Sequence, residues 1–208
     1  MTVYAIFGTG GHGRVVLENM RSSECVFLDD NKPIGTRING AHVVGDRSLL
    51  SYRPFLAAHL IIIGIGDCKI RGELSRLVIK NGGHLAKSIH PTAIIRSNVE
   101  IGDGTVIMPY AIVGPNTKVG KYCIINNAAI VSHDCILGNG VNVADGATFE
   151  SEVGDEAFIG LRAVTIPKIK IGARAIVGAG SVVTKDVPPD TTVAGVPAKI
   201  IRHKGTHS

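Results

Sequence analysis

The sequence predicts two domains, a small α/β domain with a parallel, Rossmann-like sheet and a larger, all-β left-handed parallel β-helix. Three observations predict this division. Bulky apolar residues recur at every sixth position over most of the second half of the chain. A glycine-rich turn follows an apolar run near the start of the chain, and prolines cluster after the repeats end. We therefore expect the α/β domain over residues 1–85, the β-helix over 86–187 and a capping tail over 188–208.

The α/β domain is predicted from alternating apolar runs and helical patterns. Strands are expected at residues 3–7, 25–28 and 60–63, and helices at 14–20 and 71–80. A strand, a glycine-rich turn, a helix and a second strand, in this order, form a βαβ unit with a parallel sheet. With about three strands, the domain is shorter than a complete dinucleotide site, which needs two such halves.

The glycine-rich turn has the G-x-G-x-x-G spacing, at Gly8, Gly10 and Gly13. It lies between a predicted strand and a predicted helix, the context in which this motif binds nucleotides. Its backbone can approach a phosphate, and the helix N-terminus offers unpaired N–H groups. Asp29, at the end of the second strand, has the position that binds ribose hydroxyls in dinucleotide folds. A nucleotide-containing ligand fits this short domain better than NAD, and a tight turn without a ligand is the alternative.

The six-residue period predicts the β-helix. It matches neither the 3.6-residue period of an amphipathic helix nor the two-residue alternation of a lone strand. It is typical of a hexapeptide β-helix, in which three hexads close one triangular coil and coils stack at about 4.8 Å. Anchors eighteen residues apart, such as Ile107 and Ile125, should stack inside the coil. The anchors are Ile89, Ile95, Ile101, Ile107, Val113, Val119, Ile125, Val131, Leu137, Val143 and Phe149, then Val153, Ile159, Thr165, Ile171, Val177 and Val183.

The period is interrupted at two places. Position 155 should be an anchor but is Asp155, so the register slips within residues 148–152. This slip predicts a local corner change or a short loop, with or without a functional role. After Val183, prolines would interrupt a strand ladder, so we expect the coil to end there. The tail should cover the open edge, with a short helix over 198–203 and disorder in the last five residues.

Composition and charge exclude several classes of protein. The net charge is +5, but the basic residues are scattered, which argues against nucleic acid and is compatible with a polyanionic ligand such as a nucleotide diphosphate or coenzyme A. The four cysteines form no CxxC pair, so we expect free thiols, no disulfide and no zinc site. No signal peptide or membrane span is apparent, and a cytoplasmic protein is expected.

His133 is the candidate catalytic residue of the repeat region. It takes the third position of its hexad, which projects outward, and Asp134 follows it directly. A carboxylate that touches an imidazole fixes its tautomer and raises its basicity. An ordinary surface histidine is the alternative. His90 is the other histidine of residues 86–187, so a metal site built from three histidines is not expected.

Five motifs together resemble those of one known family. They are GTGGHG at residues 8–13, FLDD at 27–30, IHPTA at 89–93, VSHD at 131–134 and AGVPAK at 194–199. Over nearly its whole length the chain resembles the bacterial nucleotide-sugar acetyltransferases that make N-acetylated bacillosamine and perosamine. Sialic acid O-acetyltransferases belong to the same group of hexapeptide-repeat acyltransferases.

The resemblance implies a homotrimer with active sites between subunits, acetyl-CoA as the co-substrate and no metal. It implies that His133 is the general base, with Asp134 beside it and Asn126 near the reaction centre. The implied nucleotide-sugar contacts are Gly10, Gly11, His12, Asp29 and Asp30. The implied acetyl-CoA contacts are Asn142, Ser151, Leu161 and Ala179, although Asn142 and Ser151 depart from the residues of the bacillosamine-type relatives.

The function predicted on this basis is acetyl-CoA-dependent N-acetylation, for surface glycan or glycoprotein synthesis. The acceptor would be the 4-amino group of a nucleotide-linked 4-amino-4,6-dideoxy sugar, with a UDP sugar favoured. O-acetylation of sialic acid or another sugar is the first alternative. An NAD(P)-dependent oxidoreductase, suggested by the glycine-rich turn, and a non-catalytic trimeric scaffold are weaker alternatives.

Overall fold

The structure, a computed structural model, describes residues 3–20 and 23–203 and divides into two compact units, Met1–Ser88 and Ile89–Ser208. The sequence placed this boundary after residue 85. The disorder predicted for the last five residues lies outside the described part. Within that part, no helix has the length and apolar character needed to cross a membrane.

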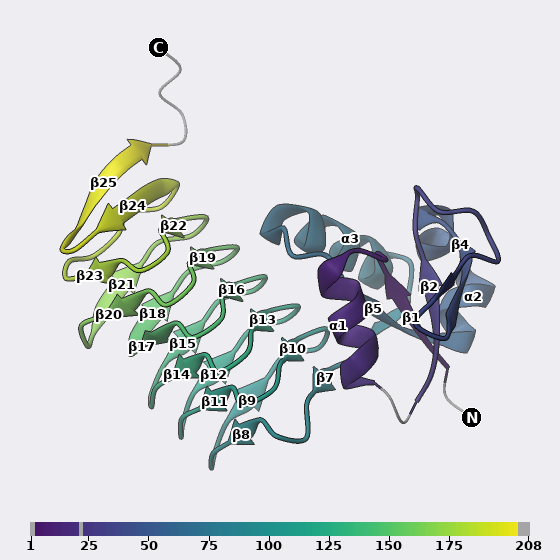
Figure 1. Ribbon diagram of the computed structural model, residues 1–208, viewed down its shortest axis with the longest axis horizontal. Coiled ribbons are helices and arrows are strands. Elements are labelled where there is room, and N and C mark those ends of the chain that lie inside the picture. The colour runs from purple at the N-terminus through teal and green to yellow at the C-terminus, as the bar shows by residue number, and fades with distance from the viewer. Residues whose placement is uncertain (1–2, 21–22, 204–208) are drawn as a thin grey trace. The chain divides into compact units, whose positions relative to one another are not determined.

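The first unit is an α/β fold built on a mostly parallel sheet with strand order β3-β4-β2-β1-β5-β6, which has six strands within the described residues (Figure 1). The predicted strands and helices are present. They are β1 (Val3–Phe7), α1 (Gly11–Asn19), β2 (Glu24–Leu28), β5 (His59–Ile63) and α3 (Cys68–Lys80). Their apolar runs account for this, because the central strand β1 buries Ala5 and Ile6 fully, as expected for a parallel sheet covered by helices.

The expected number of about three strands was wrong, because the sheet is extended by short edge strands. The additional elements are β3 (Arg37–Ile38), β4 (Ala41–Gly45), the 3-10 helix η1 (Arg47–Ser51), α2 (Arg53–Ala58) and β6 (His84–Leu85). β3 and β6 are two residues long, too short to produce a detectable period in the sequence. β3 pairs antiparallel with β4, while β6 extends the other edge by pairing parallel with β5.

Glycines allow the glycine-rich turn to pack closely on the sheet. A Cβ added at Gly13 would collide with the carbonyl oxygen of Gly8, and one added at Gly64 would lie 2.8 Å from the Cα of Gly13. The start of α1 therefore lies directly against the ends of β1 and β5. This is the role of the third glycine in a nucleotide-binding turn, close packing of helix on strand.

The second unit is a left-handed parallel β-helix with three flat faces. The first face holds β7 (Ser88–Ile89), β10 (Val106–Ile107), β13 (Ile124–Ile125), β16 (Asn142–Val143), β19 (Phe158–Ile159), β22 (Ile176–Val177), β24 (Thr191–Gly195) and β25 (Ala198–His203). The second face holds β8 (Ile94–Ile95), β11 (Ile112–Val113), β14 (Ile130–Val131), β17 (Thr148–Phe149), β20 (Val164–Thr165) and β23 (Val182–Val183). The third face holds β9 (Glu100–Ile101), β12 (Lys118–Val119), β15 (Ile136–Leu137), β18 (Ser151–Val153) and β21 (Ile169–Ile171).

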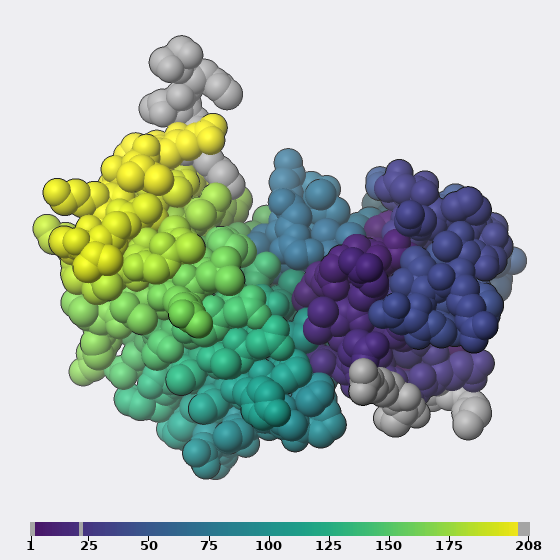
Figure 2. Space-filling model, viewed as in Figure 1, coloured from purple at the N-terminus to yellow at the C-terminus, as the bar shows by residue number. Residues whose placement is uncertain are grey.

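The anchors stack inside the coil as the period predicts. Ile107 pairs with Ile125, and Ile125 pairs with Val143, one coil apart each time. The small residue four positions after an anchor also points inward, as at the fully buried Ala111 and Ala129. Each fully buried anchor contributes about 1.5–3 kcal/mol of hydrophobic stabilisation. The space-filling view shows the coils of this unit in contact in chain order, from teal to yellow (Figure 2).

The register slip is a shortened corner rather than a loop. Val131 pairs with Phe149 at the normal eighteen-residue period. Leu137 pairs with Val153, two residues earlier than that period would place its partner. The chain therefore turns from β17 to β18 with Glu150 alone between the two strands. We call the segment Phe149–Glu150–Ser151 the short corner.

The predicted end of the coil was wrong. Val187 and Val193 belong to the buried core, and β24 pairs parallel with β22, so the first face continues beyond Val183. Val187 forms a bridge to Ile171, again two residues earlier than the full period would place it. This second shortening of the coil lies between Val183 and Val187, before the prolines, and was not seen in the sequence.

The predicted helix over 198–203 was also wrong, because these residues form strand β25. β25 pairs antiparallel with β24 at the yellow end of the unit (Figure 1). The last parallel strand of a β-helix leaves a row of unpaired backbone groups. β25 forms hydrogen bonds with these backbone groups. This tertiary contact outweighs the helix propensity of residues 198–203.

Candidate active site

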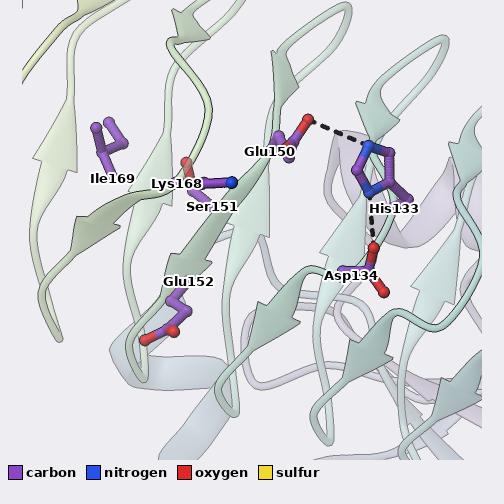
Figure 3. A pocket seen from close by; sticks show the side chains of 7 residues that line it. All are labelled: His133, Asp134, Glu150, Ser151, Glu152, Lys168 and Ile169. Atoms are coloured by element: carbon purple, nitrogen blue, oxygen red, sulfur yellow. Dashed lines mark hydrogen bonds and ion pairs between the residues drawn. The ribbon is translucent and has the colours of Figure 1, made fainter.

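His133 lies at the corner that joins the second face to the third, just after β14, and its side chain is 54% exposed (Figure 3). We call this edge of the coil the second corner. The anchor Val131 is fully buried, and the N–H of Ser132 donates to the carbonyl of Phe149 in the next coil. The N–H of Asp134 donates to the carbonyl of Pro115 in the preceding coil. Both neighbouring coils therefore hold the backbone of the corner, and the third hexad position projects outward as the sequence predicts.

Asp134 touches His133 because the chain bends sharply between them. Asp134 has φ 53°, in the left-handed region that Asp tolerates better than most residues. This bend brings its Oδ2 to 2.8 Å from His133 Nδ1. The hydrogen bond to Asp134 and the nearby charge of Glu150 raise the pKa of His133 above its ordinary value. Hydrogen bonds from His133 and Asn116 lower the pKa of Asp134, which stays ionised.

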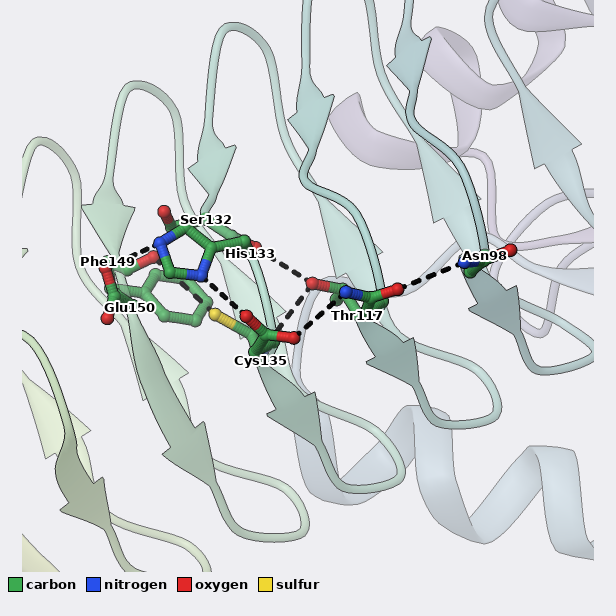
Figure 4. Close-up of polar contacts among 9 residues, drawn as sticks. Asn98, Thr117, Ser132, His133, Cys135, Phe149 and Glu150 are labelled. Atoms are coloured by element: carbon green, nitrogen blue, oxygen red, sulfur yellow. Dashed lines mark hydrogen bonds and ion pairs between the residues drawn. The ribbon is translucent and has the colours of Figure 1, made fainter.

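A ladder of polar side chains from the preceding coils orients Asp134 through the carboxylate oxygen that does not contact His133. Asn98 Nδ2 donates to Asn116 Oδ1 at 3.2 Å, and Asn116 Nδ2 donates to Asp134 Oδ1 at 3.1 Å (Figure 4). All three residues have positive φ and stand one coil apart at the second corner. Sequence analysis missed this ladder. Its signal was available, since residues that tolerate positive φ recur there at the eighteen-residue period.

Glu150 approaches His133 from the opposite side. Its Oε2 lies 3.4 Å from His133 Nε2, and its side chain is 25% exposed. Figure 3 shows Glu150 and Asp134 reaching different nitrogens of the same imidazole ring. Sequence analysis missed this contact, although the register slip indicated that residues 148–152 were unusual.

These residues line an open pocket of about 350 Å³ on the β-helix, formed by His133, Asp134, Glu150, Ser151, Glu152, Lys168 and Ile169. Three carboxylate side chains and one lysine are among these lining residues, and Asp134 and Glu150 are the two carboxylates that contact the imidazole. Among the lining residues, Ser151 is buried, and its Oγ lies 3.0 Å from Thr165 Oγ1.

Asn126 and most of the predicted acetyl-CoA contacts lie elsewhere on the same unit. Asn126, Leu161 and Ala179 occupy the corner that joins the first face to the second, which we call the first corner. Asn126 Nδ2 donates to Asn142 Oδ1 at 3.0 Å, so these two predicted residues are brought together. Leu161 and Ala179 are exposed one coil apart, and the carbonyl of Leu161 accepts from Gly180 N at 2.7 Å. Within one chain, the first and second corners are different edges of the coil.

The predicted nucleotide-sugar residues gather at the glycine-rich turn of the first unit. Gly10 and Gly11 have open space where a side chain would be, with His12 following in α1. Asp29 Oδ2 accepts from the N–H and hydroxyl of Thr9 at 2.8 and 2.6 Å. Partial burial pushes the pKa of Asp29 upward, but these bonds, one from Asn31 and the charge of Lys32 hold it below its ordinary value.

Asp30 is held by a basic residue instead of by the glycine-rich turn. Its Oδ1 accepts from the backbone N–H of Arg47 at 2.9 Å, and its Oδ2 accepts from Arg47 Nε at 2.7 Å. Asp29 and Asp30 therefore have fixed orientations before any ligand binds. Each carboxylate oxygen can accept more than one hydrogen bond, so both acids retain capacity for ligand hydroxyls.

Burial makes two of the four thiols, Cys25 and Cys135, harder to ionise. All four cysteines are free, and burial raises the pKa of Cys25 to about 11. Burial also raises the pKa of Cys135, which lies inside the coil below His133. A reactive cysteine requires a lowered pKa, so the geometry favours a histidine base rather than a covalent thiol intermediate. Within residues 3–20 and 23–203, no three histidine, cysteine or acidic side chains group as metal ligands.

Comparison with known proteins identifies the family. The PglD N-terminal domain matches residues 4–78, and two hexapeptide-repeat families, one of bacterial transferases and one of succinyl-transferases, match residues 98–133 and 152–185. GDP-perosamine N-acetyltransferase of Escherichia coli O157:H7 is 34% identical over 222 residues, covering 99% of each chain. The chain belongs to this family of hexapeptide-repeat nucleotide-sugar acetyltransferases. The family predicted from the five motifs is confirmed.

Solved structures of the family confirm the predicted fold class. PerB from Caulobacter crescentus, solved in complex with CoA and GDP-perosamine, is 34% identical with a TM-score of 0.90, covering 97% of this chain and 98% of that one. The acetyltransferase domain of PglB from Neisseria gonorrhoeae is 33% identical with a TM-score of 0.92, covering 97% and 100%. The same domain has been solved in complex with acetyl coenzyme A.

Proposed function

We propose that this protein transfers the acetyl group of acetyl-CoA to the amino group of a nucleotide-linked 4-amino-4,6-dideoxy sugar. The observation that carries this proposal is the His133 imidazole, which is bonded to Asp134 through Nδ1 and presents Nε2 to the pocket. The same chain carries a glycine-rich turn suited to a nucleotide diphosphate, and a relative that it matches over nearly its full length is a GDP-perosamine N-acetyltransferase.

The proposed chemistry is direct transfer. The neutral amine of the sugar attacks the thioester carbonyl carbon, and a C–N bond forms. His133 Nε2 takes the proton that this nitrogen loses, and Asp134 stabilises the resulting imidazolium. The C–S bond then breaks, and the sulfur leaves as the thiol of CoA after receiving that proton. Backbone N–H groups of a neighbouring subunit's coil would stabilise the oxyanion.

The charge of the pocket supports an amine acceptor over sialic acid. Asp134 and Glu150 line it against one basic side chain, Lys168, while the third carboxylate, Glu152, is paired with Lys170. A negative wall attracts the ammonium form of an amino sugar before it loses its proton. The same wall repels the carboxylate of sialic acid. N-acetylation is therefore the preferred reaction, and O-acetylation of a sialic acid is the alternative that this charge disfavours.

We infer a homotrimer, because the proposed roles fall on two separate edges of one coil. His133 and Asp134 are at the second corner, whereas Asn126, Leu161 and Ala179 are at the first. A three-fold arrangement would place the second corner of one subunit beside the first corner of the next. Acetyl-CoA would then lie between coils, with Asn142 and Ser151 nearby, and Asn126 would face the reaction centre.

In the α/β unit, Gly10, Gly11 and His12 would hold the diphosphate, and Asp29 and Asp30 the ribose and base. The sequence favoured a UDP sugar. Two nearly full-length matches at 34% identity are named for GDP-perosamine, so a GDP sugar stands beside UDP as a candidate. The match of residues 4–78 to the PglD N-terminal domain removes the basis of the oxidoreductase alternative.

The test is CoA thiol release from acetyl-CoA against GDP-, UDP- and dTDP-linked 4-amino-4,6-dideoxy sugars and free sialic acid. We expect rapid turnover with one nucleotide amino sugar and a product acetylated on nitrogen. Turnover with sialic acid alone would overturn the N-acetylation proposal. No thiol release with any acceptor would favour the scaffold alternative.

A further inference from the structure

The short corner places a carboxylate where the regular coil would not. In a full hexad, several corner residues separate one strand from the next, but here Glu150 alone joins β17 to β18. The pairing of Leu137 with Val153 measures this shortening. As a result, Glu150 reaches across from the next coil, and its Oε2 lies 3.4 Å from His133 Nε2.

The short corner is held by a hydroxyl group in an anchor position. Thr165 takes the place of an apolar anchor, and its Oγ1 accepts from Glu150 N at 3.4 Å and lies 3.0 Å from Ser151 Oγ. The carbonyl of Glu150 accepts from Lys168 N at 2.9 Å. The backbone of Glu150 is thus tied to the next coil on both sides, which limits the positions its side chain can adopt.

The position of Glu150 matters because Asp134 already occupies Nδ1 of the ring. Nε2 is then the nitrogen that must take the proton of the substrate amine, and Glu150 lies against that nitrogen. We propose that Glu150 is a positioning residue that orients the His133 ring and controls the protonation of Nε2. This inference rests on the proposed function, since it assigns a role within the same site.

The charged groups around His133 determine whether the pKa of the ring is raised or lowered. Asp134 and Glu150 both favour the imidazolium, and Lys168 opposes them. Glu152 is part of the same pocket but pairs with Lys170 at 3.1 Å. When the amine proton reaches Nε2, a carboxylate is already in place to stabilise the new charge. The protein then needs little reorganisation during transfer.

The experiment compares Glu150→Gln with the wild type in two ways. The first is the pH dependence of kcat/KM over about pH 5.5 to 9, and the second is the NMR titration of the His133 ring. Loss of the Glu150 charge should lower the His133 pKa by about half a unit or more, so the acid limb should move to lower pH. KM for acetyl-CoA should stay within about two-fold of wild type, because Glu150 acts through His133.

Two variants serve as comparisons. Glu152→Gln removes the same charge from the same pocket wall, and both the acid limb and the ring titration should keep their wild-type positions. Thr165→Val keeps the Glu150 carboxylate but releases the short corner, so it should shift the titration in the same direction as Glu150→Gln. An unchanged His133 titration in Glu150→Gln, in a variant with wild-type circular dichroism, would overturn the proposal.

The NMR titration separates this inference from the proposed function. If the wild-type protein releases no thiol with any acceptor but Glu150→Gln still shifts the ring titration, the proposed function fails while the control of His133 by Glu150 stands. If thiol is released and neither the acid limb nor the titration moves, the inference fails while the proposed function stands.

Discussion

At the scale of single residues, the candidate site depends on one left-handed residue. Asp134 can contact its own neighbour because its φ is 53°. On a regular strand the two side chains would point to opposite faces. The Asn98–Asn116–Asp134 ladder then fixes the carboxylate. The pair could be predicted from two adjacent residues at a corner, whereas the ladder and Glu150 come from other coils.

Replacing His133 by Ala should lower kcat by about 10²–10⁴-fold, the usual contribution of a general base. KM for the sugar and for acetyl-CoA should change little, because the imidazole acts on a proton in transit. Steady-state kinetics and calorimetric binding of acetyl-CoA would measure the two effects. An equal collapse of turnover and binding would contradict the assignment.

The raised pKa of His133 predicts the pH dependence of the wild-type enzyme. A general base works in its neutral form, so kcat/KM should fall as pH drops through the pKa of His133. Because Asp134 and Glu150 raise that pKa, the midpoint of the acid limb should lie above about 6.5, the ordinary value for histidine. A midpoint below that value would show that another group controls this limb.

Replacing Asn116 by Ala should lower kcat by about five-fold, equivalent to one hydrogen bond of about 1 kcal/mol. Asp134 would keep its bond to His133 but lose the donor that holds its other oxygen. Asn98→Ala is the matched control, since it removes a bond one coil farther along the ladder and should have a smaller effect. Initial rates of thiol release measure both variants, and equal losses would argue against the ladder.

At the scale of the coil, an inward-pointing residue such as Thr117 also forms hydrogen bonds with the backbone of the next coil. The hydroxyl of Thr117 donates to the carbonyl of Ser132 at 2.8 Å and accepts from Cys135 N at 3.3 Å, as Figure 4 shows in part. Thr117 is fully buried, so both backbone groups depend on it for a partner. Ser132 and Cys135 flank His133 and Asp134 in the sequence, so the buried Thr117 hydroxyl connects the core of the coil to the candidate site.

Thr117→Val should destabilise the protein by about 1–3 kcal/mol, because it leaves buried backbone groups without this hydroxyl at nearly constant side-chain volume. Thr117→Ser keeps the hydroxyl and should cost less. Urea unfolding at one fixed protein concentration would measure both, since association also affects apparent stability. If Val were tolerated as well as Ser, the hydroxyl would not be the stabilising group.

At the scale of the whole molecule, the proposed active site needs two edges of the coil that one chain cannot bring together. His133→Ala inactivates the second corner, and Ala179→Trp should block acetyl-CoA at the first. Mixed trimers of these two inactive variants should regain about a third of wild-type turnover, because one of the three sites in each mixed trimer of a closed ring combines two intact corners. Co-expression with two affinity tags and thiol release would measure this.

No recovery in mixed trimers would show that each active site is built from one chain. Each variant assayed alone is the control and should stay inactive. Sedimentation equilibrium of the wild type should show a trimer, and a monomer with full activity would overturn the shared site directly.

Local patterns in the sequence predict much of this protein. The hexad period predicts the stacking of Ile107 on Ile125, and the glycine spacing predicts the turn between β1 and α1. The outward position of His133 follows from its place in the hexad. These features depend on residues within a few positions of each other, or on a period repeated many times, so local physics specifies them.

Other features depended on contacts across the fold. The strand over Ala198–His203 forms because the edge of β24 needs a partner. β24 itself extends a coil that was expected to end at the prolines. The contact between Glu150 and His133 exists because two residues are missing from one corner, which changes how that coil meets the previous one. A period identifies the repeat. Which side chain contacts His133 where the repeat is shortened depends on how the coils stack, and only the tertiary structure shows it.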